Sequence, residues 1–97
     1  MLRAGVLGLC LVGAAGCGPV QYAAQIDAAS ARLDQARDAN ARWFAPFDYY
    51  YAEAHLAQAR REAAEASYED AILYAEIAER YGRRALRVAL ERGRAER

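Results

Sequence analysis

The sequence contains no lysine and no threonine, and it has only two prolines, two cysteines and one histidine. All thirteen basic residues are arginines, and thirteen acidic residues balance them, so no net charge directs the chain to nucleic acid. The prolines stand at Pro19 and Pro46, which leaves long stretches free for helices. No run alternates polar and apolar residues with the period of a strand. These absences argue against a nucleic-acid-binding protein and against a β-sheet.

Residues that could perform catalysis are also scarce. Beyond the first sixteen residues, Ser30 and Ser67 are the only serines and His55 is the only histidine. A serine nucleophile needs a base within reach and a third group that orients the base, and a metal site needs a cluster of ligands at defined spacing. Neither pattern is present in the sequence. We therefore expect no enzymatic activity, no cofactor, no metal and no small-molecule substrate.

What the sequence has in abundance is alanine, which occurs twenty-five times. Alanine and arginine are strong helix formers, and 97 residues suit a single domain. The composition predicts an all-α, alanine-rich fold.

The first sixteen residues differ from the rest. Arg3 supplies a positive charge, the run from Ala4 to Val12 is apolar apart from two glycines, and small residues follow up to Gly16. This order of charge, apolar stretch and small residues is typical of a secretory signal peptide. The alternative, a membrane-spanning helix, needs about 20 apolar residues, and the apolar run is shorter and rich in glycine. We therefore expect residues 1–16 to be a cleaved signal peptide and residues 17–97 to form the mature helical domain.

The four residues "AAGC", Ala14 to Cys17, resemble the lipobox of bacterial lipoproteins. The resemblance implies that a peptidase recognises Ala14, Ala15 and Gly16 and cuts the chain once, between Gly16 and Cys17. It also implies that acyl chains are attached to the sulfur of Cys17 and to its newly formed amino group. It also implies a lipid-anchored protein of the cell envelope. The residue after the cysteine is Gly18, which in this family favours the periplasmic face of the outer membrane over the inner membrane.

Three helices are predicted for the mature chain, at about residues 21–44, 49–66 and 68–92, in an antiparallel hairpin or three-helix bundle. Asp48 is the predicted N-cap of the second helix, and Ser67 with Asp70 is a predicted capping box for the third. Gly93 is the predicted end of the third helix.

Apolar residues recur at intervals of three and four on each predicted helix, which is the pattern of a buried helix face. On the first two helices the predicted faces pair in antiparallel register, with large residues mostly opposite small ones. They comprise Tyr22, Ile26, Ala29, Leu33, Ala36, Asn40 and Trp43, and Tyr49, Ala52, Leu56, Ala59, Ala63 and Ala66. The third helix carries a stripe of small residues: Ala71, Ala75, Ala78, Gly82, Ala85 and Ala89. Its apolar face covers more than half of the circumference, so we expect this helix to contact two neighbours.

Two further groups of residues are candidates for contacts. The segment "WFAPFDYYY", Trp43 to Tyr51, is expected mainly to close one end of the bundle near Tyr81 and Ala85, with at least one tyrosine exposed. The candidate partner surface comprises Tyr49, Tyr50, Tyr51, Tyr74 and Tyr81. Charge is segregated, since seven of the arginines lie between Arg80 and Arg97 with only two acids. The candidate contacts to an anionic surface are Arg83, Arg84, Arg87, Arg92 and Arg94.

The span from Ala45 to Ala85 resembles a helical domain of unknown function found in small bacterial envelope lipoproteins, some of which continue into an OmpA-like domain. The resemblance implies a lipid-anchored, non-enzymatic scaffold or accessory subunit of an envelope assembly. Residues 66–78 also resemble the second half of a tetratricopeptide repeat, with Tyr68, Ala71 and Ala78 in place, so the alternative is a helical adaptor that binds a protein. An alanine-rich core buries little area in so small a domain, and we therefore expect self-association or docking to a protein partner.

Overall fold

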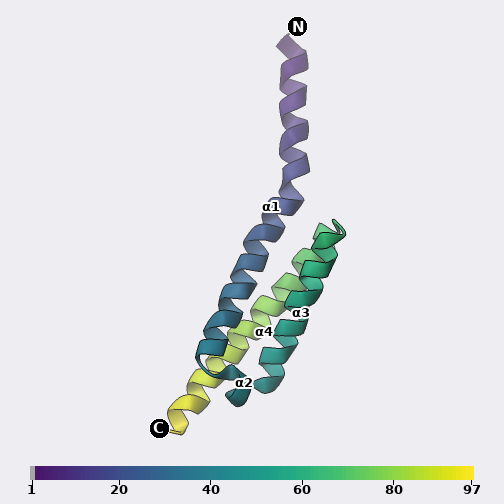
Figure 1. The fold of residues 1–97 in the computed structure, drawn as a ribbon. Coiled ribbons are helices and arrows are strands. Elements are labelled where there is room, and N and C mark those ends of the chain that lie inside the picture. Colours follow the sequence, from purple (N-terminus) through teal and green to yellow (C-terminus); the bar gives the residue numbers. More distant parts are fainter. Residues whose placement is uncertain (1) are drawn as a thin grey trace.

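In a computed structural model, the chain forms four helices: α1 (Leu2–Asp38), α2 (Ala41–Phe44), α3 (Pro46–Ala64) and α4 (Tyr68–Ala95). The structure describes the backbone of residues 2–97 and the side chains of residues 17–97. No strand occurs in this described backbone, which confirms the all-α fold. The three long helices run antiparallel in sequence order, and α2 is a single turn that joins α1 to α3 (Figure 1).

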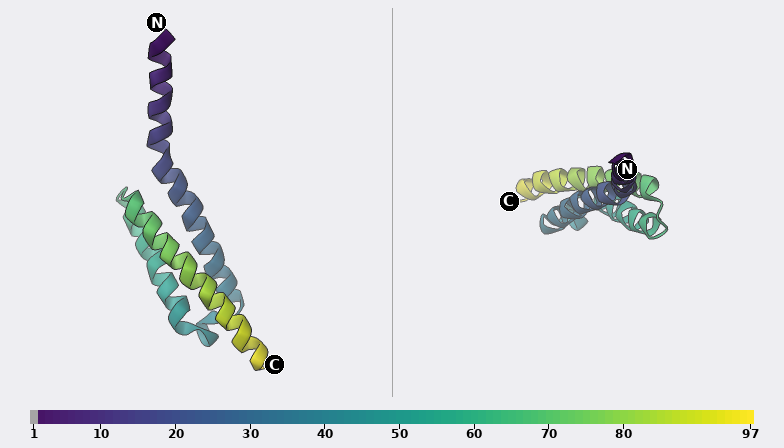
Figure 2. Two further views of the ribbon diagram at one scale, coloured as in Figure 1. Left: turned by 180° about the vertical axis from the view of Figure 1, so that it is seen from behind. Right: turned by 90° about the horizontal axis from the view of Figure 1, so that it is seen from above.

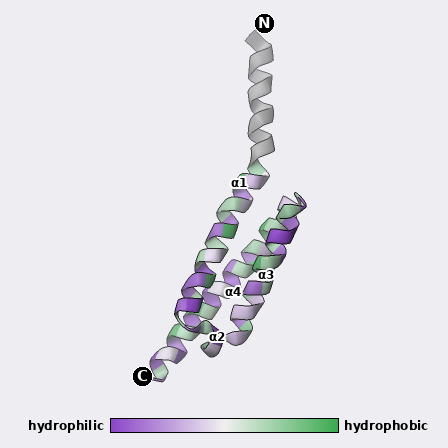
Figure 3. Ribbon diagram, in the orientation of Figure 1, coloured by the Kyte–Doolittle hydropathy of each residue, from purple (hydrophilic) through white to green (hydrophobic). Residues whose placement is uncertain are grey.

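The last helix organises the bundle. α4 packs along both α1 and α3, whereas α1 and α3 touch each other over a much smaller area (Figure 2). The whole predicted small-residue stripe of α4 is buried, from Ala71 to Ala89. The prediction that this helix contacts two neighbours is therefore confirmed, while the expected direct pairing of the first two helices is only a minor part of the packing. Polar and apolar residues are interspersed along α3 and α4 (Figure 3). The buried residues recur mainly at intervals of three and four, as in helices that bury one face.

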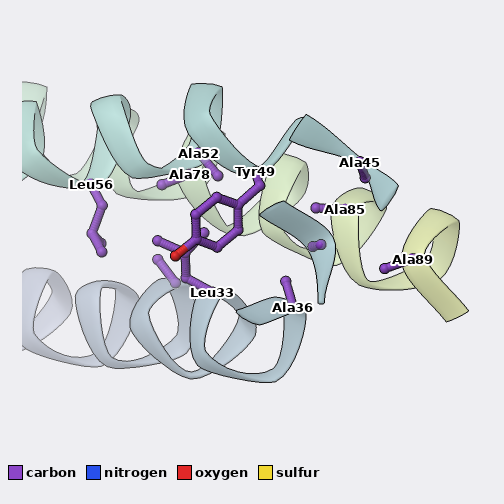
Figure 4. Packing of buried hydrophobic residues seen from close by; sticks show 11 residues of the cluster. Leu33, Ala36, Ala45, Tyr49, Ala52, Leu56, Ala78, Ala85 and Ala89 are labelled. Atoms are coloured by element: carbon purple, nitrogen blue, oxygen red, sulfur yellow. The ribbon is translucent and has the colours of Figure 1, made fainter. Parts of the chain in front are cut away.

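Alanine dominates the core, and one aromatic ring fills it. The buried cluster combines Leu33 and Leu56 with Tyr49 and eight alanines (Figure 4). Tyr49 is the largest side chain that is fully buried among the described residues. The small side chains allow α4 to approach α1 closely: a Cβ atom added at Gly82 would lie 3.3 Å from the Cβ atom of Arg32.

The first predicted helix is interrupted near its end, which corrects the expected span of 21–44. Asn40 has φ 62° and ψ 38°, a left-handed conformation that asparagine tolerates better than most residues. The break turns α2 away from the axis of α1. As a result Asn40 is exposed and the side chain of Trp43 is 72% exposed, so neither belongs to the buried face predicted for this helix.

The predicted helix caps are wrong in their details. Helix α3 begins at Pro46, and Asp48 lies inside its first turn, buried, instead of capping it. Proline suits the first position of a helix because its missing N–H would be unpaired there in any case. Ser67 stands at the N-cap of α4 without a side-chain hydrogen bond, so the capping box with Asp70 is not formed. Helix α4 also continues past Gly93 to Ala95.

The turn between α3 and α4 ends α3 with a left-handed alanine. Ala66 has φ 60°, its N–H donates to the carbonyl of Ala63, and the N–H of Ser67 donates to the carbonyl of Glu62. This pair of bonds is the Schellman motif, in which glycine is the preferred residue because it has no Cβ to clash.

Replacing Ala66 with glycine is therefore expected to stabilise the bundle. The left-handed conformation costs an alanine about 1 kcal/mol, of which the variant should recover most. Urea unfolding followed by circular dichroism should show a higher midpoint with an unchanged slope. The matched control is Ala54→Gly, in the exposed interior of α3, which should destabilise by about 1 kcal/mol. If Ala66→Gly destabilised the protein as much as Ala54→Gly, the left-handed role given to Ala66 would be contradicted.

Candidate functional site

The two ends of the bundle carry different candidate residues. Cys17 is exposed at the end formed with the α3–α4 turn, where a Cβ atom added at Gly18 would lie 3.4 Å from the Cβ atom of Tyr68. At the same end, the ring centroids of Tyr22 on α1 and Tyr68 on α4 lie 6.1 Å apart. We call this the cysteine end. The side chains of the predicted cleavage residues Ala14, Ala15 and Gly16 lie outside the described residues.

The opposite end is formed by α2, the first turns of α3 and the last turns of α4 (Figure 1). We call this the distal end. A helix rises 1.5 Å per residue, so the stretch of α1 from Cys17 to Asp38 separates the two ends by about 30 Å.

The prediction that Tyr49 belongs to the tyrosine surface is wrong. Tyr49 has no exposed area, because it points between the helices into the alanine core (Figure 4). Its hydroxyl accepts a hydrogen bond of 3.1 Å from Nε of Arg37. This bond raises the pKa of the Arg37 guanidinium above its ordinary value. Tyr49 is therefore a core residue and cannot meet a partner.

Three of the other predicted tyrosines, Tyr51, Tyr74 and Tyr81, take part in a continuous row of rings along the junction of α3 and α4. On α3, Phe47 stacks on Tyr51 at 5.6 Å between ring centroids, and Tyr51 lies 4.3 Å from His55. From α4, Tyr81 lies 4.4 Å from Tyr51, which confirms that Tyr81 is near the aromatic segment, and Tyr74 lies 6.0 Å from His55. We call these five residues the aromatic row. Phe47 and His55 were not among the residues predicted for the partner surface, although their spacing of four from Tyr51 is a signal that could have placed them there.

The aromatic segment does not close the end of the bundle as predicted. Exposure is 72% for Trp43, 70% for Phe47 and 51% for Tyr50, and only Tyr49 of this segment's long aromatic side chains is fully buried. The prediction that at least one of the consecutive tyrosines is exposed is confirmed. We call Trp43, Phe47 and Tyr50 the aromatic tip.

The predicted arginines surround the same end, and several already have partners. Arg83 pairs with Glu79, Nε of Arg84 lies 3.3 Å from Oδ2 of Asp48, and Arg92 donates to the carbonyl of Phe44. Arg87 and Arg94 are exposed. A shallow surface hollow of about 290 Å³ is lined by Arg80, Tyr81, Arg83, Arg84 and Arg87. The structure thus brings the arginines and the aromatic residues together, although the sequence analysis treated them as separate surfaces.

The ion pair of Asp48 with Arg84 joins α3 to α4 at the distal end. Asp48 is 8% exposed and stands in the first turn of α3, where a negative charge also interacts favourably with the helix dipole. We expect Asp48→Asn to lower the free energy of unfolding by about 1 kcal/mol, because Arg84 is well exposed and water weakens the pair. Urea titrations at low and high salt test this, and the difference should shrink as salt screens the charges. The control is Asp34→Asn, whose ion pair with Arg37 is exposed on both sides and should contribute almost nothing.

Two further kinds of site were searched for in the described part of the chain. It holds no cluster of histidine, cysteine, aspartate and glutamate that could bind a metal ion. None of its helices meets the length and hydropathy needed to span a bilayer.

Comparison with known protein families assigns the chain to a family. Residues 24–97, more than half of the sequence, match the model of a family described as a domain of unknown function, DUF4398. The chain is therefore a member of the DUF4398 family. No curated protein and no solved structure matches it significantly.

Proposed function

We propose that this protein is a small lipid-anchored lipoprotein of the bacterial envelope, which serves as a non-enzymatic scaffold or accessory subunit. The observation that carries the proposal is the position of Cys17, which is exposed and directly precedes Gly18, where α1 lies against Tyr68 of α4. An acylated Cys17 would hold the bundle by its cysteine end.

Pro19 supports a mature chain that starts at Cys17. In an uninterrupted helix, this proline cannot donate the hydrogen bond to the carbonyl of Ala15 and clashes with the preceding turn, at a cost of about 3 kcal/mol. After cleavage before Cys17, no such carbonyl remains and Pro19 stands in the first turn, where proline is well tolerated. The sequence around the cysteine thus suits a helix that begins there.

The remaining surface supports a binding role over a chemical one. The exposed side chains of the distal end include aromatic residues and arginines, which are common at interfaces with partners. Anchoring at the outer membrane with the bundle in the periplasm follows from the lipobox resemblance and from Gly18. The candidate anionic contacts Arg83, Arg84, Arg87, Arg92 and Arg94 would then belong to the surface farthest from the anchor.

The intact mass of the protein, expressed in a bacterium with its own first sixteen residues, tests the anchor. We expect a chain that starts at Cys17 and carries three acyl chains. Cys17→Ala should abolish both the cleavage and the lipid, whereas the matched variant Cys10→Ala should retain them. An unlipidated wild-type chain that retains Met1 would refute the proposal.

A further inference from the structure

Exposed apolar side chains are concentrated at one end of the molecule. Among the described residues, seven large hydrophobic side chains are exposed, and five of them lie at the distal end: Trp43, Phe47, Tyr50, Tyr51 and Leu90. The other two, Val20 and Leu73, lie on α1 and α4 nearer the cysteine end. A small soluble domain gains nothing in stability from exposing a tryptophan and a phenylalanine, so the cluster indicates a contact surface.

The last turns of α4, which help to form the distal end, are basic, while Asp48 and Glu53 of α3 stand at the same end. Between Arg80 and Arg97 the chain has seven arginines and two glutamates. Arg94 and Arg97 line a hollow with Leu90, and Arg84 and Arg92 line another with Phe47. Apolar side chains therefore stand directly beside guanidinium groups on the same end of the bundle.

We propose that the distal end is a second membrane contact, at which the aromatic tip enters the interfacial region of an anionic bilayer and the surrounding arginines bind the lipid phosphates. Tryptophan and tyrosine favour the headgroup region, phenylalanine is common on the apolar face of interfacial helices, and each arginine near an anionic surface adds about 1 kcal/mol of attraction. Long arginine side chains also extend their charged groups to the phosphates while their methylene groups cover apolar surface.

The shape of the tip favours a bilayer over a folded partner. Trp43 and Phe47 are each more than two-thirds exposed, and the hollow that Phe47 lines is open to solvent. A fluid interface accepts such projecting rings with no complementary cavity. This contact does not require acylation of Cys17. If both contacts form, the bundle is held at its two ends and lies along the membrane.

Trp43 is the only tryptophan in the chain, so its fluorescence reports on the tip directly. The full chain, expressed with its own N-terminal residues, is mixed with vesicles of phosphatidylcholine and phosphatidylglycerol in equal parts, or of phosphatidylcholine alone, with bromine on the acyl chains. With the anionic vesicles, we expect a blue shift of the emission and quenching by bromine, both of which weaken at high salt. With phosphatidylcholine alone, both effects should be much smaller.

Variants assign the contact to the tip. Phe47→Ala should weaken the quenching-detected affinity for anionic vesicles by about tenfold, from the lost apolar burial. Arg94→Gln should weaken it by about fivefold, from the lost charge. The matched controls are Leu73→Ala and Arg60→Gln, which remove an exposed leucine and an exposed arginine away from the tip and should leave the affinity unchanged.

The orientation distinguishes the tip contact from an upright bundle. In the double variant Trp43→Phe/Leu73→Trp, the reporter moves toward the cysteine end. Both reporters are compared in chains that also carry Cys17→Ala, which cannot be acylated there. In these chains the tip contact predicts stronger quenching at position 43 than at position 73, and a bundle standing on its cysteine end predicts the reverse.

Two results would overturn the tip contact. The first is protein that floats with the vesicles while Trp43 keeps a water-exposed emission without quenching. The second is a concentration-dependent blue shift without bromine quenching, which would assign the tip to a second copy of the chain. If acylation of Cys17 is absent, the tip contact still predicts flotation with anionic vesicles, so its failure and that of the lipid anchor are separable.

Discussion

The variant Tyr49→Ala is expected to lose about 4 kcal/mol of folding free energy, which is the cost typical of removing a fully buried aromatic ring. A small domain has about 5–15 kcal/mol of stability in total, so the variant should be close to unfolding at room temperature. The reason is specific to this core: the other members of the buried cluster are alanines and two leucines, and none can move into the space of a ring. Urea unfolding followed by circular dichroism measures the loss.

Two further variants show how much of this loss comes from the buried ring of Tyr49. One removes only its hydroxyl, and the other truncates the neighbouring, half-exposed tyrosine. Tyr49→Phe removes only the hydrogen bond from Arg37 and should cost about 1 kcal/mol. Tyr50→Ala truncates the adjacent tyrosine, which is half exposed, and should cost well under half of the loss at Tyr49. If Tyr50→Ala were as damaging as Tyr49→Ala, the assignment of Tyr49 to the core and Tyr50 to the tip would be wrong.

The variant Gly82→Leu is expected to destabilise the bundle by about 3 kcal/mol or more, because overpacking forces backbones apart. A Cβ atom at position 82 would already lie 3.3 Å from the Cβ atom of Arg32 and 3.5 Å from the backbone nitrogen of Leu33. A leucine would add three further carbon atoms against the backbone of α1, which cannot yield as a flexible side chain can. The α1–α4 packing should open or shift, and the loss would appear in the same urea titration.

The glycine at position 93 on the same helix provides the matched control. A Cβ atom there would meet only a ring atom of Phe44, at the ordinary distance of 3.6 Å. Gly93→Leu should therefore be tolerated, and Gly93→Ala should stabilise α4 by about 1 kcal/mol through helix propensity. The stability of Gly82→Ala should lie between that of Gly82→Leu and that of Gly93→Ala. The substitution gains the same helix propensity as Gly93→Ala, but the tight contact with α1 opposes this gain. Equal losses from leucine at both positions would contradict the close approach at Gly82.

The two ends of the bundle give the protein a simple functional layout. One end presents Cys17, for which we propose a lipid, and the other presents the aromatic tip with its arginines. The aromatic row of α3 and α4 starts at Phe47 in that tip and extends toward the middle of the bundle. Any partner held by the exposed part of this row would meet the protein along its side as well as at its end.

Much of the fold was predictable because helix periodicity is a local property. The spacing of small residues from Ala71 to Ala89 identified the buried stripe of α4, and the width of its apolar face showed that it needs two neighbours. The same periodicity placed Leu33 and Leu56 in the core. Three members of the aromatic row, Tyr51, Tyr74 and Tyr81, were also named from the sequence, since tyrosines stand out in an alanine-rich chain, whereas Tyr49 was wrongly included.

What the sequence could not decide is where each aromatic residue of the segment from Trp43 to Tyr51 would point. Three consecutive tyrosines fit several helix phases equally well. The left-handed Asn40 ended α1 and turned α2, where Trp43 is exposed, and a second break at Ala45 set the phase of α3, on which Tyr49 points inward. Asp48 likewise acts as the partner of Arg84, a residue of another helix, although its position near a proline suggested a cap.

The sequence by itself determined that this protein is an all-helical bundle built around small residues, because composition and periodicity act through neighbouring turns of one helix. Only the tertiary structure decided which rings are core and which are surface, and that the exposed rings share one end with the arginines. That outcome depends on two backbone breaks, at Asn40 and at Ala45, and on contacts between helices distant in the chain, and neither is encoded in any local pattern.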